Sequence, residues 1–192
     1  MIFLWTKSNL VGSRLIRWGL DEPCSHFAVC FFEERGSTAL VLESTLEHGS
    51  APCWLGDFLT RNNVVHALQA PVESNRTADD LMHRIGGRLQ GRKYDRNGVL
   101  FWSAMALRRK MFGTKIPGVN EWSRSELLYC VEILQEMPEL LADLDVELSL
   151  DMTSPEMVYT ILKECNFLVD VTEYFQSVDR TLENRRAPTI AA

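Results

Sequence analysis

The distribution of apolar residues predicts one short helix, then strands, then helices. Residues 8–19 carry apolar side chains at helical spacing and close on a glycine, which is typical of a short helix. Three apolar, β-rich runs follow at residues 26–34, 39–45 and 63–72, and the polar ERGS segment between the first two indicates a hairpin turn. Segregated elements of this kind favour the α+β class, with a small antiparallel sheet packed against several helices.

The second half of the chain is predicted to be mainly helical. Residues 98–112 are apolar on most sides and should form a largely buried helix. Ser154 and Pro155 have the residue types of an N-cap and a first helical position. Residues 166–175 could form a final strand. Other helices are expected over residues 77–90, from Ser123 onwards, and over 138–145.

Length and composition are those of one globular domain. The 192 residues are 46% apolar and 24% charged, an ordinary balance that predicts one domain over residues 1–180 and a flexible tail over 181–192. The N-terminal MIFLWTK has a short apolar run with no basic region before it, so we expect no signal peptide. No apolar run is long enough to span a membrane, and we expect a cytoplasmic or virion location.

The five cysteines do not form a recognisable framework. They are odd in number, scattered and without a CxxC pair, so we expect reduced thiols. Cys24, His26 and Cys30 could share a strand face, but their spacing matches no usual zinc pattern. The sequence also has no GxGxxG motif and no P-loop, and we expect neither a metal nor a cofactor.

Charge is distributed unevenly along the chain. Residues 76–115 carry ten Lys and Arg against three Asp and Glu, whereas residues 121–192 carry five against fifteen. The arginines of the basic segment have the spacing of a solvated helix face, so nucleic-acid binding is not expected. The acidic final third is better suited to packing near the basic segment or to binding a basic partner protein.

Three separated segments could together carry chemistry. His26 begins one predicted strand, and Glu43 ends the next, within reach if the two strands form a hairpin. Ser123 and Glu126 have capping-box spacing at the start of a later helix. A histidine oriented by a polar residue beside a helix N-terminus is typical of a cysteine nucleophile site. A structural role for either residue is the alternative, since a lone histidine on an apolar strand is often a core residue.

The order of these motifs resembles that of the permuted papain-like hydrolases, relatives of the NlpC-type cell-wall peptidases. In that family a Ser-His strand is followed by a Glu-bearing strand end, a Tyr-Asp pair and a W-x-C-S-E-L helix start that carries the nucleophile. The corresponding segments here are SHFAV (25–29), VLES (41–44) with Gly49, Tyr94-Asp95, WSRSEL (122–127) and the late SPEMVY helix start. The resemblance implies the papain-like fold, with His26 as general base and Glu43 as its orienting group.

The nucleophile position departs from the family pattern. Arg124 occupies it, and a guanidinium, which stays charged, cannot attack a carbonyl. Ser125 is a weak alternative nucleophile because it lies about 100° around the predicted helix. Cys130 lies about 9 Å further along the same predicted helix and is judged too far away. Cys24 could share a face with the histidine, but no helix start is predicted beside it.

Two functions are therefore expected from the sequence. The first is a catalytically degenerate papain-like domain that binds other proteins as a component of a bacterial or phage assembly. The second is an active cysteine-type peptidase or amidase that uses a displaced nucleophile on a peptidoglycan or acyl substrate. Arg124 favours the first, because the chemistry needs a thiolate where the sequence has a cation.

Overall fold

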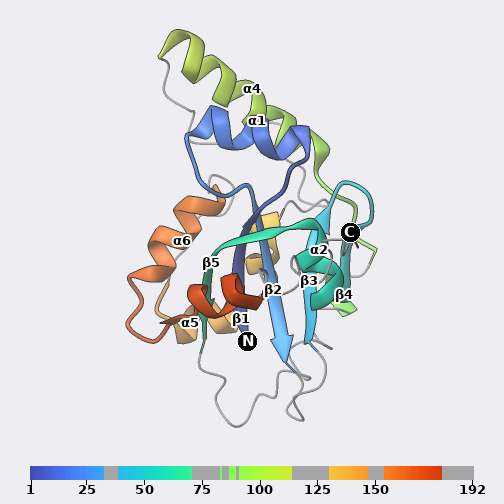
Figure 1. Ribbon diagram of the computed structural model, residues 1–192, viewed down its shortest axis with the longest axis vertical. Coiled ribbons are helices and arrows are strands. Elements are labelled where there is room, and N and C mark those ends of the chain that lie inside the picture. The colour runs from blue at the N-terminus through green and yellow to red at the C-terminus, as the bar shows by residue number, and fades with distance from the viewer. Residues whose placement is uncertain are drawn as a thin grey trace, which may run out of the picture.

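The computed structural model describes residues 1–32, 39–70, 83, 87–89, 91–113, 130–146 and 154–178. Its centre is a six-stranded antiparallel sheet in the order β4-β3-β2-β1-β5-β6, which places the first strand of the chain inside the sheet (Figure 1). The strands are β1 (Ile2–Lys7), β2 (His26–Phe32), β3 (Ala39–Thr45), β4 (Gly49–Trp54), β5 (Asn63–Gln69) and β6 (Val169–Asp170). The α+β class is confirmed.

The helices pack on both faces of this sheet and at one end of it. They are α1 (Val11–Leu20), α2 (Leu55–Arg61), α4 (Arg96–Phe112), the 3-10 helix η1 (Cys130–Glu136), α5 (Pro138–Asp143) and α6 (Pro155–Lys163). Residues 172–178 are also helical. The strand expected over residues 166–175 is therefore confirmed only at Val169–Asp170, because residues 166–168 are not in a strand and the residues after β6 turn into a helix. The change from strand to helix after Asp170 has a local cause, because Asp170 Oδ1 accepts a hydrogen bond of 2.9 Å from the Thr172 backbone N–H.

The two faces of the sheet form two apolar clusters. Alternate residues of β1 and β2 point to opposite faces, so Phe3 and Phe27 join the larger cluster and Leu4 and Ala28 the smaller. The larger cluster is covered by η1 and α6, and the smaller by α2 and Phe175. Because both faces of β1 are covered, five consecutive residues of this segment are fully or almost fully buried. This explains why its sequence is an apolar run without alternation.

Ser154 caps α6 as its residue type predicts. Its Oγ accepts a hydrogen bond of 3.2 Å from the Met157 backbone N–H and donates one of 2.5 Å to Glu22 Oε1. Pro155 follows at the first helical position. The cap therefore starts α6 and also fastens it to the segment that leads into β2.

The prediction of a largely buried helix over residues 98–112 is wrong. This segment is helical, within α4, and Phe101 is buried, but α4 lies beside α1 at one end of the molecule, away from the sheet (Figure 1). Four of its large apolar side chains are 47–70% exposed: Leu100, Leu107, Met111 and Phe112. The predicted turn at ERGS, most of the predicted helix over 77–90, the helix start at Ser123 and the tail lie outside the described residues.

Candidate active site

His26 and Glu43 meet at one end of the β2–β3 hairpin. The register pairs Ala28 with Glu43, so the histidine two residues earlier is a diagonal neighbour of the carboxylate. His26 Nε2 lies 3.2 Å from Glu43 Oε2, and their side chains are 16% and 6% exposed. The proximity expected from a hairpin is therefore present, and Nδ1 remains as the ring nitrogen that can exchange a proton with another group.

Glu43 is held in its charged form by His26 and Arg61. Arg61, the last residue of α2, donates a hydrogen bond of 2.7 Å from Nη2 to Glu43 Oε1, and the Cys53 thiol lies 3.4 Å from the same oxygen. Burial disfavours the carboxylate, but the hydrogen bonds and charges of His26 and Arg61 outweigh it and lower the pKa of Glu43 to about 2. This buried carboxylate is thus an anion at any physiological pH.

A third residue, Cys130, completes the cluster from η1. Its side chain is hydrogen-bonded to His26, and it is the first residue of that 3-10 helix. Burial disfavours the imidazolium, but hydrogen bonds and negative charge from Cys130 and Glu43 outweigh it and raise the pKa of His26 to about 9. His26 is therefore placed to exchange a proton with the Cys130 sulfur beside it.

The structure places Cys130, which the sequence analysis set aside as too far from the predicted nucleophile position, beside His26. That distance was counted along a predicted helix from Ser123, which lies outside the described residues, and the 3-10 helix that carries Cys130 packs against β2 and β3. Arg124 and Ser125, the predicted nucleophile position and its weak substitute, lie outside the described residues. The signal that could have found Cys130 is the Cys-x-Glu spacing of residues 130–132, which supplies the cysteine and glutamate of the family's C-S-E-L, whereas residues 124–127 match its other three letters but lack the cysteine.

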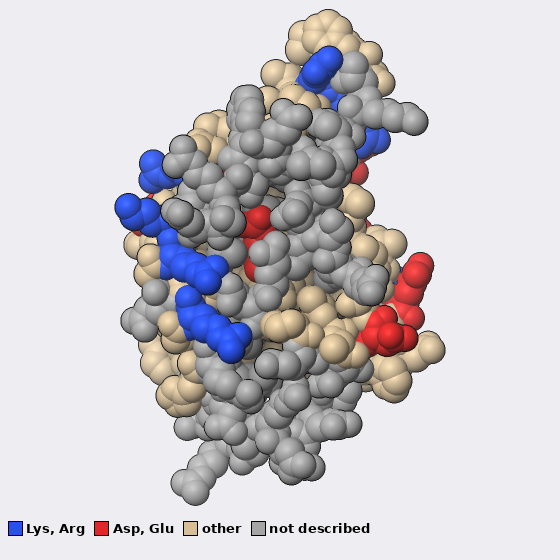
Figure 2. Space-filling model, turned by 180° about the vertical axis from the view of Figure 1, so that it is seen from behind, with Lys and Arg blue, Asp and Glu red and all other residues tan. Residues whose placement is uncertain are grey.

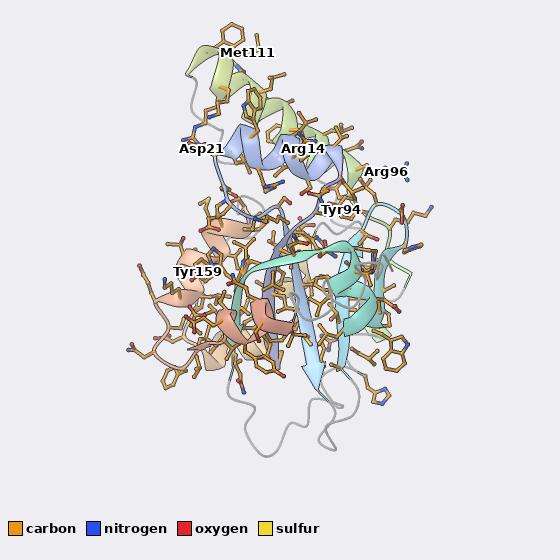
Figure 3. All side chains as sticks on the ribbon, viewed as in Figure 1. Arg14, Asp21, Tyr94, Arg96, Met111 and Tyr159 are labelled. Atoms are coloured by element: carbon orange, nitrogen blue, oxygen red, sulfur yellow. The ribbon has the colours of Figure 1, made fainter. Side chains whose placement is uncertain are left out.

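Tyr94 and Asp95 lie near Cys130. Burial, followed by the charges of Cys130, Asp95 and Glu132, raises the pKa of Tyr94. Figure 3 shows Tyr94 between the sheet and the start of α4. The preceding backbone is fixed to β4, because the Arg92 carbonyl accepts a hydrogen bond of 2.9 Å from Ser50 N–H.

Cys24, the other alternative nucleophile, is engaged elsewhere. Its thiol donates a hydrogen bond of 3.3 Å to Glu156 Oε2, and it is fully buried. Burial and the charge of Glu156 raise the pKa of Cys24. A cysteine whose thiol form is stabilised in this way is a poor nucleophile at neutral pH.

Cys24, His26 and Cys30 do not converge on a metal. Cys24 belongs to the larger apolar cluster and Cys30 to the smaller, on opposite faces of the sheet. Within the described part of the chain, no group of three or more His, Cys, Asp and Glu side chains is arranged to hold a metal ion.

Comparison with solved structures finds distant structural similarity. No family model matches the chain, and no curated protein matches it. A crystal structure titled metalloprotein yiiX, from Escherichia coli O157:H7, aligns with a TM-score of 0.47 and 12% sequence identity over 88% of this chain and 94% of that one. At this level of similarity we draw no conclusion about fold, metal or activity from it. Among the described residues, no helix has the length and hydropathy needed to cross a membrane.

Proposed function

We propose that this protein is a cysteine-dependent hydrolase or acyl transferase in which Cys130 is the nucleophile, His26 the general acid and base, and Glu43 the orienting group. The observation that carries the proposal is the hydrogen bond between Cys130 and a histidine that is itself bound to a buried carboxylate. Nucleophile, base and orienting group within hydrogen-bond reach are the signature of covalent catalysis.

The other cysteines support the choice of Cys130. Burial raises the pKa of Cys30 and of Cys53 to about 12, and it also raises the pKa of Cys165. Cys24 is held as a thiol by Glu156. Among the five cysteines, Cys130 alone has an imidazole as hydrogen-bond partner in the described residues, and the histidine can take its proton.

The chemistry follows from these three side chains. The Cys130 thiolate attacks the carbonyl carbon of an amide or ester, forming the C–S bond, and the imidazolium of His26 protonates the leaving nitrogen or oxygen as its bond to that carbon breaks. His26, now neutral, removes a proton from water or from an acceptor alcohol or amine, which attacks the thioester and releases the thiol. Glu43 keeps the imidazole oriented and stabilises its positive charge throughout.

The permuted papain-like, NlpC-type family remains the fold family we propose. His26 and Glu43 precede the proposed nucleophile Cys130 in the chain, which is the order of that family's motifs. The Tyr94-Asp95 pair lies between Glu43 and Cys130 in the sequence. The expectation of a degenerate domain depended on Arg124 as the nucleophile position. With Cys130 beside His26, that premise is no longer needed, and a peptidoglycan or other acyl substrate becomes the better proposal than a purely binding role.

Alkylation by iodoacetamide at neutral pH tests this assignment. We expect one cysteine, Cys130, to be modified much faster than the others, and His26→Ala to remove that difference. Cys130→Ser should abolish turnover of acyl-amide and acyl-ester substrates, including peptidoglycan fragments, whereas Cys165→Ser, a matched control at a partly exposed cysteine, should not. Equal slow labelling of all five thiols, or activity retained by Cys130→Ser, would overturn the proposal.

A further inference from the structure

Helices α1 and α4 form a projecting unit, here called the helical arm, that is apolar on its outside. The two helices pack side by side beyond the end of the sheet, with Arg96 where α4 joins the body and Met111 at the far tip (Figures 1 and 3). Lys110 lies 3.6 Å from Asp21 and 6.0 Å from the centre of the Trp18 ring, so contacts between the two helices fix the arm near its tip.

The exposed apolar side chains of the arm are ordered into stripes. On α1, Val11, Leu15 and Trp18 have the spacing i, i+4, i+7 and are 53–72% exposed. On α4, Leu100, Leu107 and Met111 share one face at spacings of seven and four residues and are 47–63% exposed. Single exposed apolar residues are ordinary, but an exposed apolar stripe on each of two adjacent helices indicates a surface that is covered in use.

The charge of the arm is of one sign. Helices α1 and α4 contain six Lys and Arg and no Asp or Glu, although the whole chain has a formal net charge of −6. The basic residues are Arg14, Arg17, Arg96, Arg108, Arg109 and Lys110. In the view from behind, blue side chains lie beside the tan surface of the projecting end (Figure 2). The occupant of this surface should therefore be apolar and negatively charged.

We propose that the helical arm docks on the surface of an anionic lipid bilayer. Helices that combine Leu, Trp or Phe with Lys and Arg bind in the interface of membranes, with the apolar side chains inserted and the cations near lipid phosphates. Neither helix can cross the bilayer, so docking is in the plane of the interface. A second copy of this chain fits less well, because a symmetric dimer through the arm would place cations against cations.

Sedimentation of the full chain with lipid vesicles tests the proposal. Vesicles of phosphatidylcholine containing about one-third phosphatidylglycerol should bind the protein, vesicles of phosphatidylcholine alone should bind it weakly, and high salt should release it. Arg108→Glu should weaken binding by at least about five-fold per charge removed, whereas Lys7→Glu, an equal charge change at an exposed position of the sheet, should have little effect.

Apolar substitutions separate insertion from simple charge attraction. Leu15→Glu and Met111→Glu, one on each helix, should each abolish vesicle binding, while Phe167→Glu, at a position 62% exposed and outside the arm, should leave it unchanged. Both arm positions are exposed, so folding should persist and can be checked by circular dichroism. Failure to bind anionic vesicles, equal binding to both vesicle types, or a dimer that Leu15→Glu dissociates without any vesicle binding would overturn the proposal. Cysteine reactivity is measured separately, so its outcome is independent of this one.

Discussion

Arg61 donates a hydrogen bond of 2.7 Å to Oε1 of Glu43, and the other oxygen of this carboxylate, Oε2, lies 3.2 Å from His26 Nε2. One buried carboxylate therefore links the end of α2 to the histidine at the start of β2. Because the carboxylate has a cation on each side when His26 is protonated, the orientation of the imidazole depends on a residue that never touches it.

Replacing Arg61 by Ala should weaken both the fold and the orientation of His26. Glu43 would remain buried with one cation fewer, and its pKa should rise from about 2. Since the Arg61 side chain is 42% exposed, solvent screening limits the expected loss to about 1–2 kcal/mol at neutral pH. Urea unfolding measures it, with Arg14→Ala as an exposed arginine for comparison; equal midpoints in the two variants would contradict the prediction.

The pH dependence of stability should carry the signature of His26. Its pKa is raised from 6.5 to about 9, so protonation favours the folded state, and this contribution is complete below about pH 6.5 and lost as the pH rises through 9. Unfolding free energies should fall by about 1–3 kcal/mol across that window. His26→Gln should flatten the profile there. An equally steep fall in the variant would assign it to other groups.

Glu43 should act at the opposite end of the scale. Its folded pKa of about 2 lies below the ordinary 4.5, so its contribution is present above about pH 4.5 and lost as the pH falls through 2. Glu43→Gln should remove this acid sensitivity and also lower the pKa of His26, because the imidazolium loses a charged partner. Titration of the His26 ring protons by NMR measures the second effect, and an unchanged histidine pKa would contradict it.

Gly49→Ala should be strongly destabilising. This glycine has φ +68°, and an added Cβ would overlap the Arg92 carbonyl, which accepts the Ser50 N–H hydrogen bond. A loss of about 1–3 kcal/mol is expected in chemical unfolding. Gly12→Ala is the matched control, because Gly12 lies in α1 with nothing within 4 Å of a new Cβ, and it should be neutral or stabilising.

Ser154→Ala should destabilise α6 in a pH-dependent way. Loss of the cap costs about 1 kcal/mol, and Glu22 loses the hydroxyl that donates to its carboxylate. Burial raises the pKa of Glu22 to about 7, so its charged form predominates only above that value. The variant should therefore lose more stability above pH 7 than below it, as thermal unfolding at two pH values would show. Thr160→Ala, on the exposed side of the same helix, should not show this difference.

The sequence indicated β2, β3, β5 and α6 because each has a strong local signal. β1 was not predicted, since its unbroken apolar run has no alternation, and only burial of both faces explains it. β4 contains Gly49 and Pro52, which argue against a strand, yet it pairs as an edge strand. Such elements depend on tertiary contacts that no local pattern carries.

The candidate site was predicted in two of its three parts. His26 and Glu43 are neighbours through hairpin register, which short-range sequence patterns can indicate. The position of Cys130 depends on how η1 packs against a sheet formed about a hundred residues earlier, and helical geometry counted from Ser123 could not supply it. The burial of α4 was predicted wrongly for a related reason. The sequence pattern of an apolar helix is the same whether the helix is buried in a core or exposed beside it.

The central place of β1 also constrains the order in which the molecule can form during synthesis. The first strand can pair with β2 soon after both are synthesised. Its pairing with β5 comes later, because it joins residues as distant in sequence as Ile2 and Gln69. Contacts this distant close slowly. The hairpin that holds His26 and Glu43 can thus form long before Cys130 leaves the ribosome, so the three side chains come together only once η1 packs against the sheet.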